Sequence, residues 1–200
     1  MKKFELTNES EIWEKCTLYR IRALISFGKV AEGEIGGWVE RESNLSQDGN
    51  AWVTGNARVD GNARVDGNAW VYGNAWVTGN ARVDGNARVT GNARVDGNAW
   101  VDGNAWVTGN VWVTGNAQLQ KNDDYMTISP IGSSNGTFTT YRTKDGSIEC
   151  TRGCFVGSVD EFEEAVAKTH GENEYAKQYQ AVIALVRLRL LINESIERRR

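Results

Sequence analysis

The sequence predicts a mainly β protein in which a solenoid of parallel strands is followed by a small C-terminal α+β domain. Two observations predict this class. The dipeptide Gly-Asn recurs every six residues through the middle of the chain, and beyond about residue 121 three strand-like segments precede two helical patterns. We therefore divide the 200 residues into an N-terminal β cap (1–36), the repeat (37–121) and the C-terminal domain (122–200).

The N-terminal cap is expected to contain a strand over 17–24, because TLYRIRAL alternates apolar and polar residues. Residues 36–47 continue the six-residue period imperfectly. At a spacing of 18 residues, Leu45 falls in the column of the repeat's alanines and Gln47 in the column of its valines. We interpret this stretch as a cap at the start of the solenoid.

The repeat keeps its phase without a slip, with Gly-Asn starting at residues 49, 55, 61, 67, 73, 79, 85, 91, 97, 103, 109 and 115. Each unit reads Val, then Thr or Asp, then Gly-Asn, then Ala, then Trp or Arg. Because strand side chains alternate, an inward Val59 places Arg58 and Asp60 outside, and Gly61-Asn62 suits a turning backbone. The valines are therefore expected to stack as the core.

This pattern resembles the hexapeptide repeat of left-handed parallel β-helix proteins. The resemblance implies that three hexads make one triangular coil, with the aliphatic residue inside and a small residue near each corner. Twelve hexads would then form four coils, roughly 19 Å tall at a strand spacing of about 4.8 Å.

Residues 18 apart would lie above one another, which explains the exchange between Trp and Arg. The three faces carry Trp52, Trp70, Arg88 and Trp106; Arg58, Trp76, Arg94 and Trp112; and Arg64, Arg82, Trp100 and Gln118. Trp over Trp and Arg over Trp are favourable cross-strand pairs, worth about 0.5–1 kcal/mol each. On the third face, Asp66, Asp84 and Asp102 add a charged ladder.

The tryptophan columns are too apolar to leave as free surface. Relatives of this solenoid are commonly homotrimers packed side by side, so the resemblance implies a homotrimer. We predict an interface that contains Trp52, Trp70, Trp76, Trp106 and Trp112. Two alternatives stay open: Trp and Arg side chains that lie flat on a monomeric prism, and an aromatic platform for a ligand.

Most relatives of such solenoids are acyltransferases, which use a His base, and a few are carbonic anhydrases, which hold zinc with three His. No His lies between Gly37 and Gln120, and no loop is inserted between hexads to form an acyl-CoA pocket. We therefore expect the solenoid itself to be a scaffold, and these absences weigh against an enzyme without deciding the question; we assign no catalytic residues, no metal and no cofactor.

The arrangement of TLYRIRAL, GGWVE and NLSQDGNAWV resembles the start of β-helix proteins found in phages and prophages. A formal net charge of −3 gives no overall attraction to a nucleic acid polymer or an anionic membrane. We expect no signal peptide and no membrane span, and three cysteines without a secretory context favour reduced thiols. The expected location is cytoplasmic, which would be the host cytoplasm for a phage protein. The basic tail 197–200 is interpreted as a solvated helix end.

The C-terminal domain is predicted to contain three strands, over 125–131, 137–142 and 147–152. Ser158 and Glu161 form a capping box that opens a helix through about residue 168. A second helix is predicted from 174 to 197.

Candidate ligand-binding residues gather in this domain. A Gly/Ser-rich loop that offers N–H groups and hydroxyls beside two arginines is one way to hold a phosphate without a metal. The candidates are Ser133, Ser134, Asn135, Arg142, Arg152 and His170. Ordinary explanations also stay open, namely a hairpin loop, a helix C-cap at His170, and pairing of the arginines with nearby acids.

The preferred functional hypothesis is a non-enzymatic, homotrimeric binding protein that captures a small anionic or nucleotide-like ligand. With the phage-like resemblance, it suggests sequestration of a nucleotide signal as a counter-defence. The alternatives are an acyltransferase-like enzyme that uses His170 as a base at a subunit interface, and a purely structural scaffold.

Overall fold

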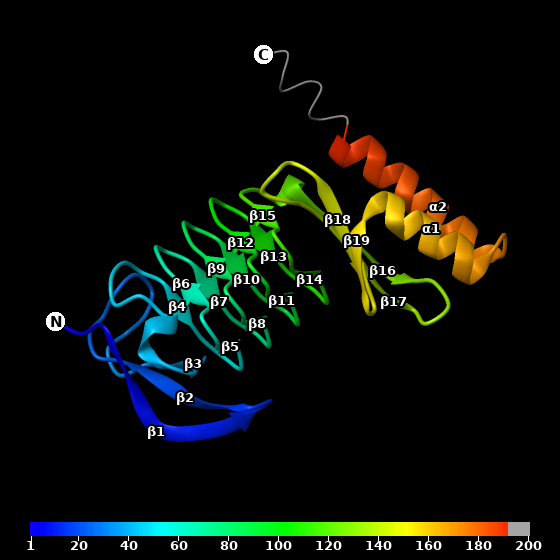
Figure 1. Cartoon of the computed structure of the whole chain (residues 1–200). Helices are drawn as coiled ribbons and strands as arrows, with labels where there is room; N and C mark the ends of the chain where they lie inside the picture. Colours follow the sequence, from blue (N-terminus) through cyan, green and yellow to red (C-terminus); the bar gives the residue numbers. More distant parts are fainter. Residues whose placement is uncertain (192–200) are drawn as a thin grey trace, which may run out of the picture. The chain divides into compact units, whose positions relative to one another are not determined.

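The computed structural model describes residues 1–191 of the chain. The chain divides into two compact units, Met1–Asn122 and Asp123–Arg200. The first is a parallel β-solenoid of about five turns, and the second combines a sheet with helices (Figure 1). The mainly β class is thereby confirmed. Within residues 1–191, no helix is long and apolar enough to cross a bilayer.

The strands of the repeat are two residues long, and each pairs one outward side chain with one inward Val or Leu. They are β4 Trp52–Val53, β5 Arg58–Val59, β6 Arg64–Val65, β7 Trp70–Val71, β8 Trp76–Val77, β9 Arg82–Val83, β10 Arg88–Val89, β11 Arg94–Val95, β12 Trp100–Val101, β13 Trp106–Val107, β14 Trp112–Val113 and β15 Gln118–Leu119. They stack as the parallel series β4-β7-β10-β13, β5-β8-β11-β14 and β6-β9-β12-β15, one for each face. Strands 18 residues apart are in register, so the predicted faces are confirmed.

The Gly-Asn dipeptide explains why the same residues return at every corner. From Asn50 to Asn98, the Asn of each dipeptide donates its backbone N–H to a Gly carbonyl in the next coil, as from Asn62 to Gly79 at 2.8 Å. The Asn side chains form ladders along the corners, where the amide of Asn62 donates to Asn80 at 3.1 Å and that of Asn80 to Asn98 at 3.0 Å. An amide is both donor and acceptor, so an identical residue above satisfies it.

The first coil departs from the predicted register. It contains β3 (Ile35–Val39) and a 3-10 turn, Glu42–Asn44. Leu45 is buried and pairs with Val65, so it belongs to the valine column and not to the alanine column. The coil is two residues longer than the others, and the extra length keeps Leu45 inside the core. Gln47 lies outside that core and binds the backbone of Phe4.

An N-terminal hairpin covers the start of the solenoid. Strands β1 (Phe4–Trp13) and β2 (Cys16–Ala23) are antiparallel and extend the sheet that continues through β3 and β5. The prediction of a strand over 17–24 is confirmed by β2, whereas β1 was missed. Phe4 and Phe27 pack edge-on against Trp52, at 6.4 and 5.4 Å between ring centroids.

The second unit is a four-stranded antiparallel sheet with helices. Its elements are β16 Tyr125–Ile131, β17 Gly136–Arg142, β18 Ile148–Arg152, β19 Phe155–Ser158, α1 Val159–His170, α2 Glu174–Val186 and a π-helical turn, Arg187–Leu191; a 3-10 turn, Asn122–Asp124, precedes them. The three predicted strands correspond to β16, β17 and β18, and only the number is wrong, because Phe155–Ser158 adds a fourth. The predicted capping box between Ser158 and Glu161 is confirmed. The α-helix ends at Val186 and continues as the π-helical turn Arg187–Leu191, whereas the rest of the predicted helix, 192–197, and the basic tail 197–200 lie outside the described residues.

Candidate functional site

A hollow of about 240 Å³ lies in the second unit. Its polar groups come from the turn between β16 and β17, from β18 and from the end of α1; they are Ser133, Ser134, Arg152, Thr169 and His170. Its walls are carbon-rich and comprise Phe155, Phe162, Ala165, Val166 and Tyr179. The hollow thus combines hydroxyls and one guanidinium with aromatic and aliphatic walls, and none of its lining residues is acidic.

Arg152 is held in place entirely by neutral oxygens. Its Nε donates to the hydroxyl of Tyr179 at 2.9 Å, and its Nη2 donates to the carbonyl of Ile131 and to Ser134 Oγ, both at 2.9 Å. Within the described part of the chain, no carboxylate forms an ion pair with this guanidinium. The positive charge is therefore oriented by its neighbours without being neutralised by them.

Two glycines allow this packing. A Cβ at Gly132 would lie 2.0 Å from the Tyr179 hydroxyl, and one at Gly136 would lie 2.4 Å from Arg152 Nη1. Side chains at these two positions would displace the groups that bind each other across the hollow. The glycine-rich loop noted in the sequence is thus required by close approach to Arg152 and Tyr179.

His170 is the last residue of α1, and its ring lies 5.8 Å from the ring of Tyr179 and 5.9 Å from that of Tyr175. The next residue, Gly171, forms the C-cap, and its N–H donates to the carbonyl of Ala167. The helix thus ends at the rim of the hollow, where a histidine also suits the negative end of the helix dipole.

The structure brings together four of the six predicted ligand residues: Ser133, Ser134, Arg152 and His170. Asn135 takes the left-handed turn position, with φ of 48°, and is not part of the lining. Arg142 lies at the opposite end of β17 from the loop, where it binds the carbonyl of Leu190 at 2.5 Å and pairs with Asp124 at 3.7 Å. Its place in the predicted site is therefore wrong, because a seven-residue strand separates it from the loop.

Sequence reasoning missed the aromatic wall. None of Tyr179, Phe155 and Phe162 is among the residues predicted to bind a ligand. The signal that could have found Tyr179 is its phenol, since a buried tyrosine hydroxyl needs a hydrogen-bond partner.

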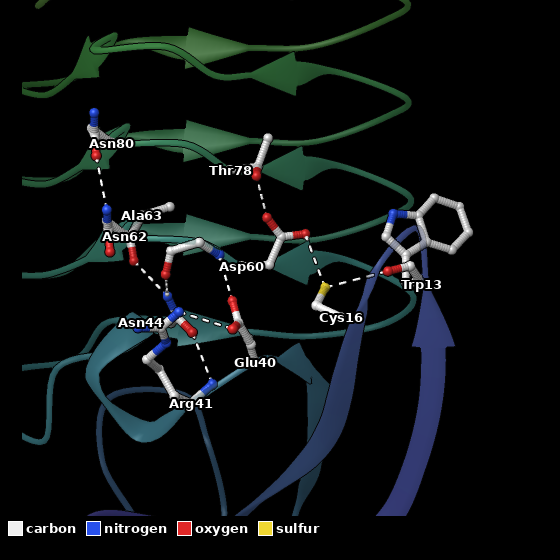
Figure 2. Close-up of polar contacts among 11 residues, drawn as sticks. Trp13, Cys16, Glu40, Arg41, Asn44, Asp60, Asn62, Ala63, Thr78 and Asn80 are labelled. Atoms are coloured by element: carbon white, nitrogen blue, oxygen red, sulfur yellow. Dashed lines mark hydrogen bonds and ion pairs between the residues drawn. The ribbon is translucent and has the colours of Figure 1, made fainter.

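A second polar cluster joins the N-terminal hairpin to the solenoid (Figure 2). The buried carboxylate of Asp60 accepts hydrogen bonds from Trp76 Nε1 at 2.8 Å and from the hydroxyl of Thr78. Cys16 Sγ lies 4.0 Å from Asp60, and burial together with the charges of Asp60 and Glu40 raises the pKa of its thiol. Through Asp60, the cluster connects Cys16 of the hairpin to Trp76 and Thr78 of the next coil.

The predicted interface tryptophans have different environments. Trp52 is fully buried beneath the N-terminal cap and is therefore unavailable to another subunit, which corrects the prediction for this residue. Trp70, Trp76 and Trp112 are half-buried, and the indoles of Trp76 and Trp112 bind Asp60 and Asp96. Trp106 is the most exposed of the five, at 44 %.

The cysteines do not converge on a metal. Cys150 is buried, and desolvation raises the pKa of its thiol to about 12, whereas Cys154 is exposed. Among residues 1–191, no three His, Cys, Asp or Glu side chains gather closely enough to hold a metal ion.

No protein-family model matches the chain, and a search of curated proteins found no match. The resemblance to acyltransferases and to phage proteins therefore gains no support beyond the β-solenoid itself.

Proposed function

We propose that the chain is a non-enzymatic binding protein that captures a small anion in the hollow of its second unit. The observation that carries this proposal is the uncompensated guanidinium of Arg152. It is oriented by Tyr179, Ile131 and Ser134, and it lines a hollow whose residues include no acid. A phosphate or carboxylate would supply the missing charge, and a charge-assisted hydrogen bond is about twice as strong as a neutral one.

The walls of the hollow favour an anion that carries a ring. Phe162 packs against Tyr179 and Phe155, at 5.3 and 5.2 Å between ring centroids, so aromatic surface lines the hollow beside Arg152. A nucleotide combines a phosphate with a planar base and fits this chemistry. Stoichiometric capture without turnover would suit sequestration of a nucleotide signal, the counter-defence role that the phage-like resemblance suggests.

The single histidine gives the test a site-specific reporter. His170 lines the hollow and is the only histidine in the chain, so an untagged protein has one imidazole signal in its NMR spectrum. We expect inorganic phosphate or adenosine 5′-monophosphate to shift this signal in a saturable way. Arg152→Gln should weaken the binding at least tenfold, which corresponds to about 1.4 kcal/mol.

Arg187→Gln is the matched control. Arg187 also lies in the second unit but pairs with Asp160 and Glu163 away from the hollow, so its replacement removes the same charge and should leave the shift intact. Native mass spectrometry of protein purified from cells would show any anion already bound. The proposal is ruled out if neither anion shifts the His170 signal. It is also ruled out if the anions shift this signal equally in the wild type and in Arg152→Gln.

A further inference from the structure

A second hollow, of about 430 Å³, lies on the first face of the solenoid. Its lining comprises Gly28, Lys29, Thr54, Trp70, Tyr72 and Arg88. It belongs wholly to the first unit, so it is independent of the pocket around Arg152. Two of its lining residues, Lys29 and Arg88, are charged at neutral pH, and both are cations.

Arg88 stands apart from the other arginines of the repeat. Arg58 pairs with Glu11 at 2.7 Å and Arg94 with Asp96 at 2.7 Å, while Arg64 and Arg82 both approach Asp66. Among the described residues, Arg88 has no carboxylate within ion-pair distance. The cause lies in the sequence, because the outward position two residues after the Trp/Arg column holds Thr54, Tyr72, Thr90 and Thr108 on this face but Asp on parts of the other two.

Tyr72 is the one aromatic residue in that column of threonines. Trp70 lies on β7 and Tyr72 directly follows that strand, so the two side chains, two residues apart, project from the same side of the backbone. Both are half-buried and line the hollow. Such a pair offers a planar surface on which an unsaturated ring can stack.

The N-terminal cap forms the other wall of this hollow, through Gly28 and Lys29. Phe27 and Val30 pair through two backbone hydrogen bonds, of 3.0 and 2.8 Å, and place Gly28 and Lys29 at the tip of a tight turn. Phe27 packs on Trp52 and Val30 is buried, so the turn is anchored at both ends. Trp52 is covered by this cap, and Trp70 is the first tryptophan of its column that the cap leaves accessible.

We infer that this hollow binds a planar aromatic ring that carries a phosphate, such as a mononucleotide. Trp70 and Tyr72 stack on the ring, and Lys29 and Arg88 bind the anionic group. Thr54 supplies a hydroxyl for a further hydrogen bond. Neither a neutral ring nor a free phosphate alone would use both halves of the site.

All eight tryptophans lie between residues 13 and 112, so tryptophan signals report on the first unit alone. The protein is labelled with 5-fluorotryptophan, and the Trp70 resonance is assigned with Trp70→Phe. We expect adenosine 5′-monophosphate to shift this resonance, and adenosine or inorganic phosphate to bind at least tenfold more weakly. Tyr72→Thr and Arg88→Gln should each weaken the binding at least tenfold.

Tyr72→Thr restores the residue found above and below it in the column, so the fold should be kept, and Arg88→Gln provides a second variant. Arg82→Gln, on the third face beside Asp66, is the control that should bind normally. The inference is overturned if the Trp70 resonance stays still, if adenosine binds as tightly as the nucleotide, or if both variants bind like the wild type. The His170 signal reports on the hollow around Arg152 and the Trp70 resonance on this one. Either proposal can therefore be refuted without the other.

Discussion

At the scale of single residues, the core and corner side chains of each hexad contact the identical residue in the neighbouring coil. Ala and Val fill a core in which neither Ala57 nor Val59 is exposed, and Asn hydrogen-bonds to Asn along each corner. The two outward positions, one on each side of Val, are the ones that vary. On the second face, the alternation places Asp60 and Asp96 beneath the indole N–H groups of Trp76 and Trp112, each 16 residues ahead.

Glycine at the corner can be tested with a matched pair of substitutions. Gly55 and Gly85 both have a positive φ, of 68° and 64°, so alanine at either should cost about 1–2 kcal/mol for the left-handed conformation. A Cβ at Gly85 would also lie 2.8 Å from the backbone nitrogen of Gly103, whereas one at Gly55 would meet nothing closer than 3.4 Å. We expect Gly85→Ala to lower the free energy of unfolding clearly more than Gly55→Ala, as measured by urea denaturation. Equal losses would show that the stacking of corners tolerates a methyl group.

At the scale of elements, the sequence predicted what repeats and missed what depends on tertiary packing. The strict period predicted the faces and the valine core, because each coil rests on an identical neighbour. The register of Leu45 was mispredicted, since two extra residues in one coil leave no signal that a fixed period detects. Strand Phe155–Ser158 was missed because it is only four residues long.

The candidate site was predictable only in part, for the same reason. The loop with Ser133 and Ser134 is a local feature, and the sequence identifies it. The choice of Arg152 over Arg142 depends on Tyr179, which is 27 residues further along the chain, and on which end of a strand faces the helices. Local patterns contain no such information.

The N-terminal cap contains a buried lysine whose titration can be measured. Lys3 is 3 % exposed, donates to the carbonyl of Ala51 at 3.0 Å and lies over the ring of Phe27. Burial lowers its pKa from 10.5 to about 8, and Asp48 and Asp66 offset this only in part. Between these two values the unfolded chain binds more protons than the folded one, so the free energy of unfolding should rise with pH.

Lys3→Met removes this titration. We expect the wild type to gain stability relative to Lys3→Met as the pH rises from about 8 to about 10.5, the interval between the folded and unfolded pKa values, in urea denaturation curves. Lys15→Met, at an exposed lysine of the same unit, should keep the wild-type pH dependence. Parallel curves for the wild type and Lys3→Met would contradict a lowered pKa.

At the scale of the whole molecule, the two units divide the chemistry between them. The solenoid is built almost entirely from pairings between its own repeats, and it departs from that rule on the first face, at Tyr72 and Arg88. The second unit departs from it at Arg152. In both places a cation that has no acidic partner among residues 1–191 lies beside aromatic rings, and each of the two proposals rests on this arrangement.

The predicted homotrimer is tested at the same scale. Trp106 is 44 % exposed and is the most accessible of the five tryptophans predicted for the interface. We expect light scattering and native mass spectrometry to show a trimer, and Trp106→Arg to shift it toward monomer. The repeat itself places Arg88 in the same column, so this substitution should preserve the coil. Trp106→Phe keeps an apolar ring and should stay trimeric. A wild-type protein that is monomeric at every concentration would remove the predicted interface.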